Sequence, residues 1–177
     1  MRHKRLRVYL SGGMEYAKGE GIEWRAELGE WLTRQLRHRV FNPNAESVKY
    51  FRRKSHTVDF RQLKFQNLDL FSKVVRGIVD FDSREIAHRS DYVICLWDRS
   101  AQRGAGTKGE LTIARFFRKP VYVVTRTKHE NIPGWILGCS TRFFTSFDEL
   151  KSFLLERYGH SQPLKDNLKG RKPWKAR

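Results

Sequence analysis

The sequence has few cysteines and no long run of apolar residues. Its two cysteines, Cys95 and Cys139, lie in apolar surroundings and lack the spacing of a disulfide pair. Free thiols are typical of a reducing compartment, so we expect a cytoplasmic protein. No apolar stretch approaches the roughly 18 residues that a membrane helix needs, and the Arg-rich start has no apolar signal segment behind it. We therefore expect no membrane partner.

Acidic residues and metal-binding patterns are also scarce. The 177 residues include 36 Lys and Arg against 19 Asp and Glu, a formal charge of +17. The six histidines are scattered without the spacing of metal ligands, so we expect no metal and no other cofactor. The length and the apolar fraction of 39% suit one globular domain with a real core.

The positive charge gathers at the two ends of the chain. Residues 1–7 carry four Lys and Arg and no acid, and residues 160–177 have a net charge of +5. The latter segment has little to bury, so we predict an α/β domain at 1–159 and a flexible basic tail at 160–177. The tail either aids solubility or attracts nucleic acid weakly. A third basic cluster at 49–56 is the better candidate to meet an anionic ligand.

Short apolar runs alternate with segments of helical period. Such strands pair in parallel, with helices on both faces of the sheet. Right-handed crossovers then predict a single doubly wound, flavodoxin-like or Rossmann-like domain with about five strands. The expected strands are 6–10, 39–44, 91–97, 120–125 and 141–146, and the expected helices are 21–39, most of 57–79, 83–90, 107–119 and 146–159.

In such a fold ligands bind beyond the carboxyl ends of the strands. Segments 9–13, 42–44, 97–110 and 125–135 lie there, so Asn42 and Asp98 become candidate binding residues. Ser11-Gly12-Gly13 follows the first strand, where two glycines let backbone N–H groups approach a ligand and the serine adds a hydroxyl. The alternative is an ordinary tight turn.

The stretch RGAGTKGELTIA at 103–114 allows two interpretations of Glu110. Thr107 suits a helix N-cap, and its spacing to Glu110 is that of a capping box. Gly109 costs about 1 kcal/mol relative to Ala in a first helical turn, which indicates that something nearby requires room. Glu110 would also project toward the strand ends, where the helix dipole favours an ionised, nucleophilic carboxylate.

Six motifs follow one another along the chain: VYLSGG (8–13), WR (24–25), VFNP (40–43), SDYVICLWD (90–98), GAGTKGELTIA (104–114) and KPVYVVT (119–125). Their order and spacing resemble the nucleoside 2-deoxyribosyltransferase family and its nucleotide N-hydrolase relatives. The resemblance spans roughly residues 6–155.

The resemblance implies a nucleoside or nucleotide substrate and assigns roles to three residues. Glu110 would be the nucleophile that attacks C1′, releases the base and forms a glycosyl-enzyme intermediate. Tyr9 would position Glu110 or the sugar. Asp82, with Asp80 as the second choice, would handle the base or its proton, although Asp82 also suits the N-cap of the helix at 83–90.

Further residues follow from the same resemblance. Gly104, Gly106 and Thr107 would line the substrate, but the family keeps an Asp or Ser where Gly104 stands. By its position at the end of the third expected strand, just before this loop, Trp97 would stack on the base or else pack in the core. The family is oligomeric, so we expect a homo-oligomer in which Asn131 completes a neighbouring site; the alternative for Asn131 is a plain loop residue.

Two other functions stay open. The segment around Glu110 also resembles cytokinin-activating phosphoribohydrolases, which cleave nucleoside monophosphates, although Gln102-Arg103-Gly104 replaces their usual Pro-Gly-Gly. The charge of +17 is compatible with a non-catalytic module that binds nucleotides or, weakly, nucleic acid. The deoxyribosyltransferase and the phosphoribohydrolase interpretations both involve cleavage of an N-glycosidic bond by Glu110.

Overall fold

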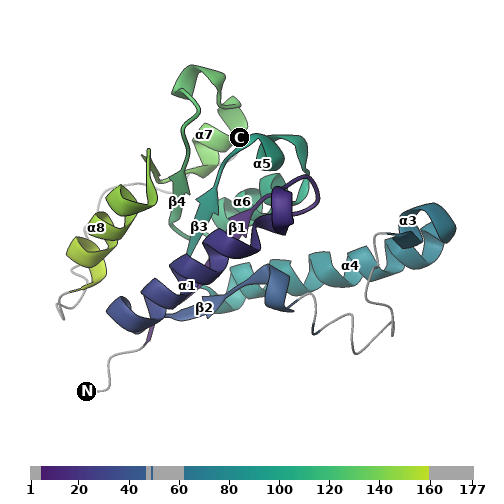
Figure 1. Ribbon diagram of the computed structural model, residues 1–177, viewed down its shortest axis with the longest axis horizontal. Coiled ribbons are helices and arrows are strands. Elements are labelled where there is room, and N and C mark those ends of the chain that lie inside the picture. The colour runs from purple at the N-terminus through teal and green to yellow at the C-terminus, as the bar shows by residue number, and fades with distance from the viewer. Residues whose placement is uncertain (1–4, 47–48, 50–61, 160–177) are drawn as a thin grey trace, which may run out of the picture.

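Five parallel strands form one sheet in the order β2-β1-β3-β4-β5 (Figure 1). The computed structural model describes residues 5–46, 49 and 62–159. The predicted doubly wound α/β fold is confirmed. The strands are β1 (Arg7–Gly12), β2 (Arg39–Phe41), β3 (Tyr92–Leu96), β4 (Val121–Val124) and β5 (Arg142–Phe144).

Helices cover both faces of the sheet. The longer ones are α1 (Ile22–Leu36), α4 (Leu68–Arg84), α6 (Gly106–Phe116) and α8 (Phe147–Tyr158). The shorter ones are η1 (Lys18–Gly21), α3 (Leu63–Gln66), η3 (Glu85–Arg89), α5 (Arg99–Arg103), η4 (His129–Asn131) and α7 (Gly134–Cys139).

The alternation of side chains along β1 divides the core into two clusters. Val8 and Leu10 pack with α1 and α8 on one face of the sheet. Tyr9 packs on the other face, with η3, α6 and α7. Because residues two apart share a face of a strand, Ser11 points to the same side as Tyr9. Both side chains therefore face α6, which carries Glu110.

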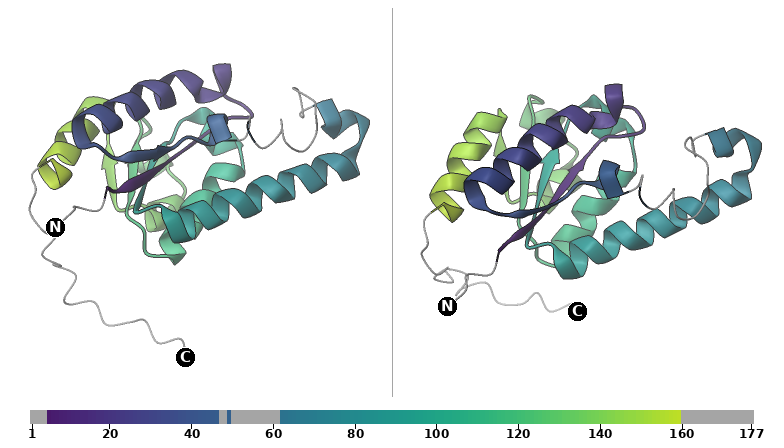
Figure 2. Two further views of the ribbon diagram at one scale, coloured as in Figure 1. Left: turned by 90° about the horizontal axis from the view of Figure 1, so that it is seen from below. Right: turned by 60° about the horizontal axis from the view of Figure 1, so that its bottom comes forward.

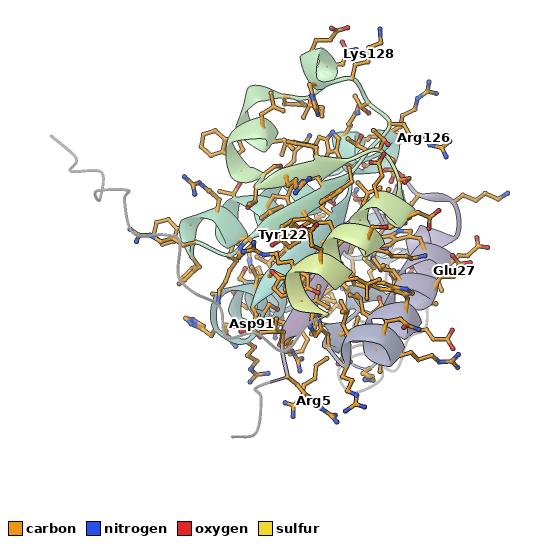
Figure 3. The ribbon with its side chains drawn as sticks, turned by 90° about the vertical axis from the view of Figure 1, so that its left-hand side faces the viewer. Arg5, Glu27, Asp91, Tyr122, Arg126 and Lys128 are labelled. Atoms are coloured by element: carbon orange, nitrogen blue, oxygen red, sulfur yellow. The ribbon has the colours of Figure 1, made fainter. Side chains whose placement is uncertain are left out.

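The two edges of the sheet carry different groups. Asp91 stands before β3, and its carboxylate accepts the backbone N–H of Arg7 at 2.7 Å. Arg126 follows β4 at the opposite edge. Figure 3 looks onto α8 and shows Asp91 and Arg126 far apart, with Tyr122 between them. Since all five strands are parallel, the Arg126 edge collects every carboxyl end, where ligands bind in this class of fold.

Helix α4 differs from the prediction. It continues directly into η3 instead of stopping before residue 83, so Asp82 lies in its last turn and is not an N-cap. Phe81 packs against the core and Ile86 is fully buried. Burying such side chains contributes about 1.5–3 kcal/mol each, which outweighs a cap of about 1 kcal/mol. The other end of α4 extends beyond the sheet (Figure 2).

Other predictions have separate outcomes. Cys95 and Cys139 are both free and buried, as expected. Within the described parts of the chain, no helix is long and apolar enough to cross a membrane. Residues 57–61, most of the basic cluster at 49–56 and the predicted tail at 160–177 lie outside the described residues.

Candidate active site

Glu110 is joined to β1 by both of its carboxylate oxygens. The Tyr9 hydroxyl donates to Oε1 at 2.8 Å, and the Ser11 hydroxyl donates to Oε2 at 2.5 Å. The two donors come from alternate residues of one strand, so the regular pleat of β1 spaces them to hold one carboxylate. The carboxylate is thereby fixed in one orientation on the α6 side of the sheet.

The capping interpretation of Glu110 is wrong. Helix α6 begins at Gly106, so Thr107 lies inside the helix, where it is buried. The N-cap position is Ala105, which makes no side-chain capping bond. Glu110 is the fifth residue of the helix, and its carboxylate bonds to β1 instead of bonding back to the first turn.

Asp82 is a second carboxyl group of the same site. Burial, and next the charge of Glu110, raise the pKa of Asp82 to about 8, while the polar hydroxyl of Tyr9 opposes the rise. The half-buried Asp82 therefore holds a proton at neutral pH. A carboxylic acid next to a second carboxyl group can donate a proton where a bare carboxylate cannot.

The Glu110 carboxyl is under opposing influences. Burial raises its pKa above the ordinary range, while hydrogen bonds from Ser11 and Tyr9 and the charge of Arg25 lower it. Burial and the charge of Glu110 hold the pKa of Tyr9 well above its usual value, so the phenol keeps its proton and remains a donor. The two carboxyl groups thus differ in environment: the hydroxyls of Tyr9 and Ser11 and the charge of Arg25 favour the ionised form of Glu110, whereas burial and the charge of Glu110 favour the protonated form of Asp82.

Gly13, directly after β1, meets the start of α5. A Cβ on Gly13 would come within 2.0 Å of the Ser100 Oγ, so only glycine permits this close approach. Asp98 is the N-cap of α5 and accepts from the Ala101 N–H at 3.0 Å and from the Ser100 hydroxyl at 2.5 Å. Asp98 therefore stabilises the loop beside Gly13 while its second carboxylate oxygen keeps further acceptor capacity.

The remaining predicted glycines and Asn42 lie around this edge in different settings. A Cβ on Gly104 would touch the Ser100 carbonyl at 3.4 Å, whereas Gly106 and Gly109 have open space around them among the described residues. The steric reason expected for Gly109 is thus not found there. The Asn42 Oδ1 accepts the backbone N–H of Asn44 at 3.1 Å, which forms a local turn after β2.

Trp97 and Asn131 do not join the Glu110 cluster. Trp97 is 1% exposed and belongs to the core cluster on the α6 side, as the core interpretation expects. Its stacking on a base stays a prediction. Asn131 is exposed at the end of η4, where its backbone N–H bonds the Lys128 carbonyl at 2.9 Å. Its expected contribution to a neighbouring subunit stays a prediction.

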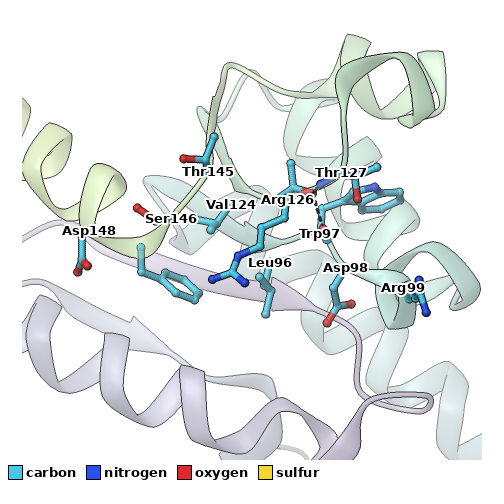
Figure 4. Close-up of a pocket in the computed structure, with 12 residues that line it drawn as sticks. Leu96, Trp97, Asp98, Arg99, Val124, Arg126, Thr127, Thr145, Ser146 and Asp148 are labelled. Carbon is cyan, nitrogen blue, oxygen red and sulfur yellow. Dashed lines mark hydrogen bonds between the residues drawn. The ribbon is translucent and has the colours of Figure 1, made fainter.

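A cleft of about 730 Å³ opens at the carboxyl ends of β3 and β4, next to the start of α8 (Figure 4). Leu96, Val124 and Phe147 are its apolar residues, and Arg126 and Asp148 stand among its polar ones. Trp97 and Asp98 are the predicted residues that line it; the sequence missed Thr145, Ser146 and Asp148. Their position just after the last strand was the sequence signal that could have identified them as residues of the cleft.

Arg25 is a functional candidate that sequence reasoning missed. Its side chain is 1% exposed and reaches from α1 to the end of β1. Its charge acts on Glu110. A lone Arg in an amphipathic helix reads as a surface residue, so the Trp24-Arg25 pair in the motif gave no sign of burial.

The described residues contain no group of three His, Cys, Asp or Glu side chains that could hold a metal ion. The chain was also compared with known proteins. No protein-family model matches it, and the search of curated proteins found no match.

Proposed function

We propose that the chain cleaves or transfers the N-glycosidic bond of a (deoxy)nucleoside or its monophosphate. Glu110 acts as the nucleophile, Asp82 as the proton donor to the base, and Tyr9 as the group that orients Glu110. The chemistry would take place beside the carboxyl end of β1, the end of the strands at which a doubly wound sheet binds its ligands.

The first step forms a glycosyl-enzyme intermediate. A Glu110 oxygen attacks C1′ as the bond between C1′ and the base nitrogen breaks, and the bonding electron pair leaves with the base. The Asp82 carboxyl gives its proton to the departing base, which leaves neutral. Asp82 is then a carboxylate, ready to take a proton back.

The second step releases the sugar. Water or another base attacks C1′, its proton goes to Asp82, and Glu110 leaves as a carboxylate. Attack by a base makes the protein a deoxyribosyltransferase, which is the role we favour; attack by water makes it a hydrolase. The hydroxyls of Tyr9 and Ser11 stabilise the Glu110 carboxylate before and after each turnover.

One observation supports the proposal above all others. Two carboxyl groups share one site in different environments: two hydroxyl donors hold Glu110, and the pKa of Asp82 is about 8. One carboxylate nucleophile and one carboxylic acid are the pair that glycoside cleavage needs.

The test is release of free base from a panel of nucleosides and 5′-monophosphates, with and without a second base. Wild type should release base, and Glu110→Ala should lose the activity. Glu156→Gln, which changes an exposed carboxylate on α8, is the matched control and should behave as wild type. Exchange of bases indicates a transferase and release alone a hydrolase; no turnover by wild type, or equal turnover by Glu110→Ala, rejects the proposal.

A further inference from the structure

Arg25 is a buried cation whose hydrogen bonds all go to main-chain carbonyls. Its Nε donates to Leu10 O at 3.2 Å and its Nη2 to Gly12 O at 2.8 Å. Its Nη1 donates to the carbonyls of Glu20 and Gly21, each at 3.1 Å. Four of the five guanidinium N–H groups thus join the end of β1 to the start of α1, with no ion pair to a carboxylate among the described residues.

The main chain that Arg25 holds is strained. Gly19, Glu20 and Gly21 have φ angles of 57°, 54° and 67°, in the left-handed region that a residue with a side chain rarely adopts. For Glu20 such a conformation costs on the order of 1–3 kcal/mol and persists only where neighbours impose it. Asn44 donates a second hydrogen bond to the Glu20 carbonyl, at 3.1 Å. Arg25 and Asn44 therefore clamp this turn from inside the molecule.

The guanidinium itself has little freedom. Its Cζ lies 4.5 Å from the centroid of the Trp24 ring, and Trp24 stacks on Phe147 with 5.7 Å between ring centroids. A Cβ on Gly21 would come within 2.6 Å of the Arg25 Nη1, so the turn closes directly on the guanidinium. A planar fork held in this way reaches several carbonyls at once, which the single ammonium of a lysine cannot do.

The charge of Arg25 also acts on the proposed nucleophile. The groups that interact with Glu110 come from four elements: Tyr9 and Ser11 on β1 and Arg25 on α1 act on its carboxylate, and its charge in turn acts on Asp82 on α4 and Cys95 on β3. Burial raises the pKa of Glu110, and the charge of Arg25 lowers it. Since Asp82 keeps its proton at neutral pH, Arg25 is the charge that opposes burial at Glu110, together with the hydrogen bonds from Ser11 and Tyr9.

We propose that Arg25 is the positioning residue of this site: it holds the 12–21 loop against the carboxyl end of β1 and supplies the positive charge that favours an ionised Glu110. This role rests on the proposed nucleophile but is measured without substrate. The measurements are carboxyl ¹³C NMR of the Glu110 titration and hydrogen exchange of the 12–21 amides, both in the full chain.

Arg25→Met removes charge and donors together. We expect the Glu110 titration midpoint to rise by about one pH unit or more, and the protection of the 12–21 amides to fall at least tenfold. If Arg25→Met does not fold, Arg25→Gln, which keeps a short donor without charge, is used in its place. Arg34→Met is the matched control, since Arg34 sits on the same helix with its side chain 73% exposed, and it should change neither quantity.

Two further variants separate the clamp from the charge. Arg25→Lys keeps the charge but not the four-carbonyl fork, so it should leave the Glu110 midpoint near wild type and lose amide protection. Asn44→Ala removes the second bond to Glu20 and should loosen the loop without moving the midpoint. An unchanged midpoint in the uncharged variant, or unchanged protection in Arg25→Lys, overturns the proposal. Because no substrate is used, a failure here is distinct from an absence of glycoside cleavage.

Discussion

At the scale of single residues, the orientation of Glu110 depends on two hydroxyl groups of β1. Tyr9→Phe and Ser11→Ala each remove one donor to its carboxylate. A hydrogen bond to a charged group contributes about 1.5–3 kcal/mol, so kcat/KM should fall roughly 10- to 150-fold in each variant. Steady-state kinetics checks this; Tyr122→Phe, on the opposite face of the sheet, is the control. Rates equal to wild type would show that neither hydroxyl orients the nucleophile.

The pKa of Asp82 sets an expected pH dependence. The acid donates its proton only while protonated, so kcat/KM should fall as the pH rises through about 8. Toward acid pH the rate should fall as Glu110 takes up a proton. Asp82→Asn cannot titrate, so its residual activity, lowered about 10²–10⁴-fold, should lack the alkaline limb. If the decrease of kcat/KM at alkaline pH persists in Asp82→Asn, the titration of another group causes it.

Stability offers a check of the same group without substrate. The folded-state pKa of Asp82, about 8, lies above the unfolded value, so the folded protein keeps a proton that the unfolded chain releases. This contribution to stability is complete at acid pH and is lost as the pH rises toward 8. Asp82→Asn should therefore gain stability over wild type in urea unfolding at pH 8 compared with pH 5. An equal difference at both values contradicts the raised pKa.

At the scale of elements, Gly109 separates helix energetics from ligand binding. A Cβ there meets no heavy atom within 4 Å, so Gly109→Ala should stabilise α6 by about 0.5–1 kcal/mol in urea unfolding. Gly13→Ala is the contrasting variant and should destabilise the protein, because its Cβ would collide with Ser100. If Gly109→Ala raises KM as well, the open space beside Glu110 belongs to the substrate. Destabilisation by Gly109→Ala would contradict the open space around a Cβ at residue 109.

The elements were predictable from the sequence to different degrees. Continuous apolar runs such as 91–97 indicate buried parallel strands by composition alone, and the fold follows from the alternation of these strands with helices. The meeting of Tyr9, Ser11 and Glu110 follows from strand alternation and the common carboxyl edge. The N-cap alternative for Asp82 was wrong because a local cap pattern cannot reveal that burial of Phe81 extends the helix. Arg25 was missed because its partners are carbonyls of a distant turn.

At the scale of the whole molecule, the charge of +17 predicts how an anionic substrate binds. A basic protein attracts a phosphate group electrostatically over a long range. Dissolved salt screens this attraction beyond about 10 Å at an ionic strength of 0.1 M. The KM of a 5′-monophosphate should therefore rise with ionic strength, whereas the KM of the matching nucleoside should stay constant. Kinetics at several NaCl concentrations decides this. Equal salt dependence of both substrates would mean that the charge serves another purpose.

The central claim is that Glu110 forms a covalent bond to C1′, and a trapped intermediate tests it most directly. An electron-withdrawing 2′-fluoro group slows breakdown of a glycosyl ester, so a 2′-fluoro-arabinosyl nucleoside should leave its sugar on the protein. Intact mass spectrometry should detect one added sugar per chain, and peptide mapping should place it on Glu110. Glu110→Gln should carry none. Turnover without any adduct, or an adduct on another residue, would contradict the account.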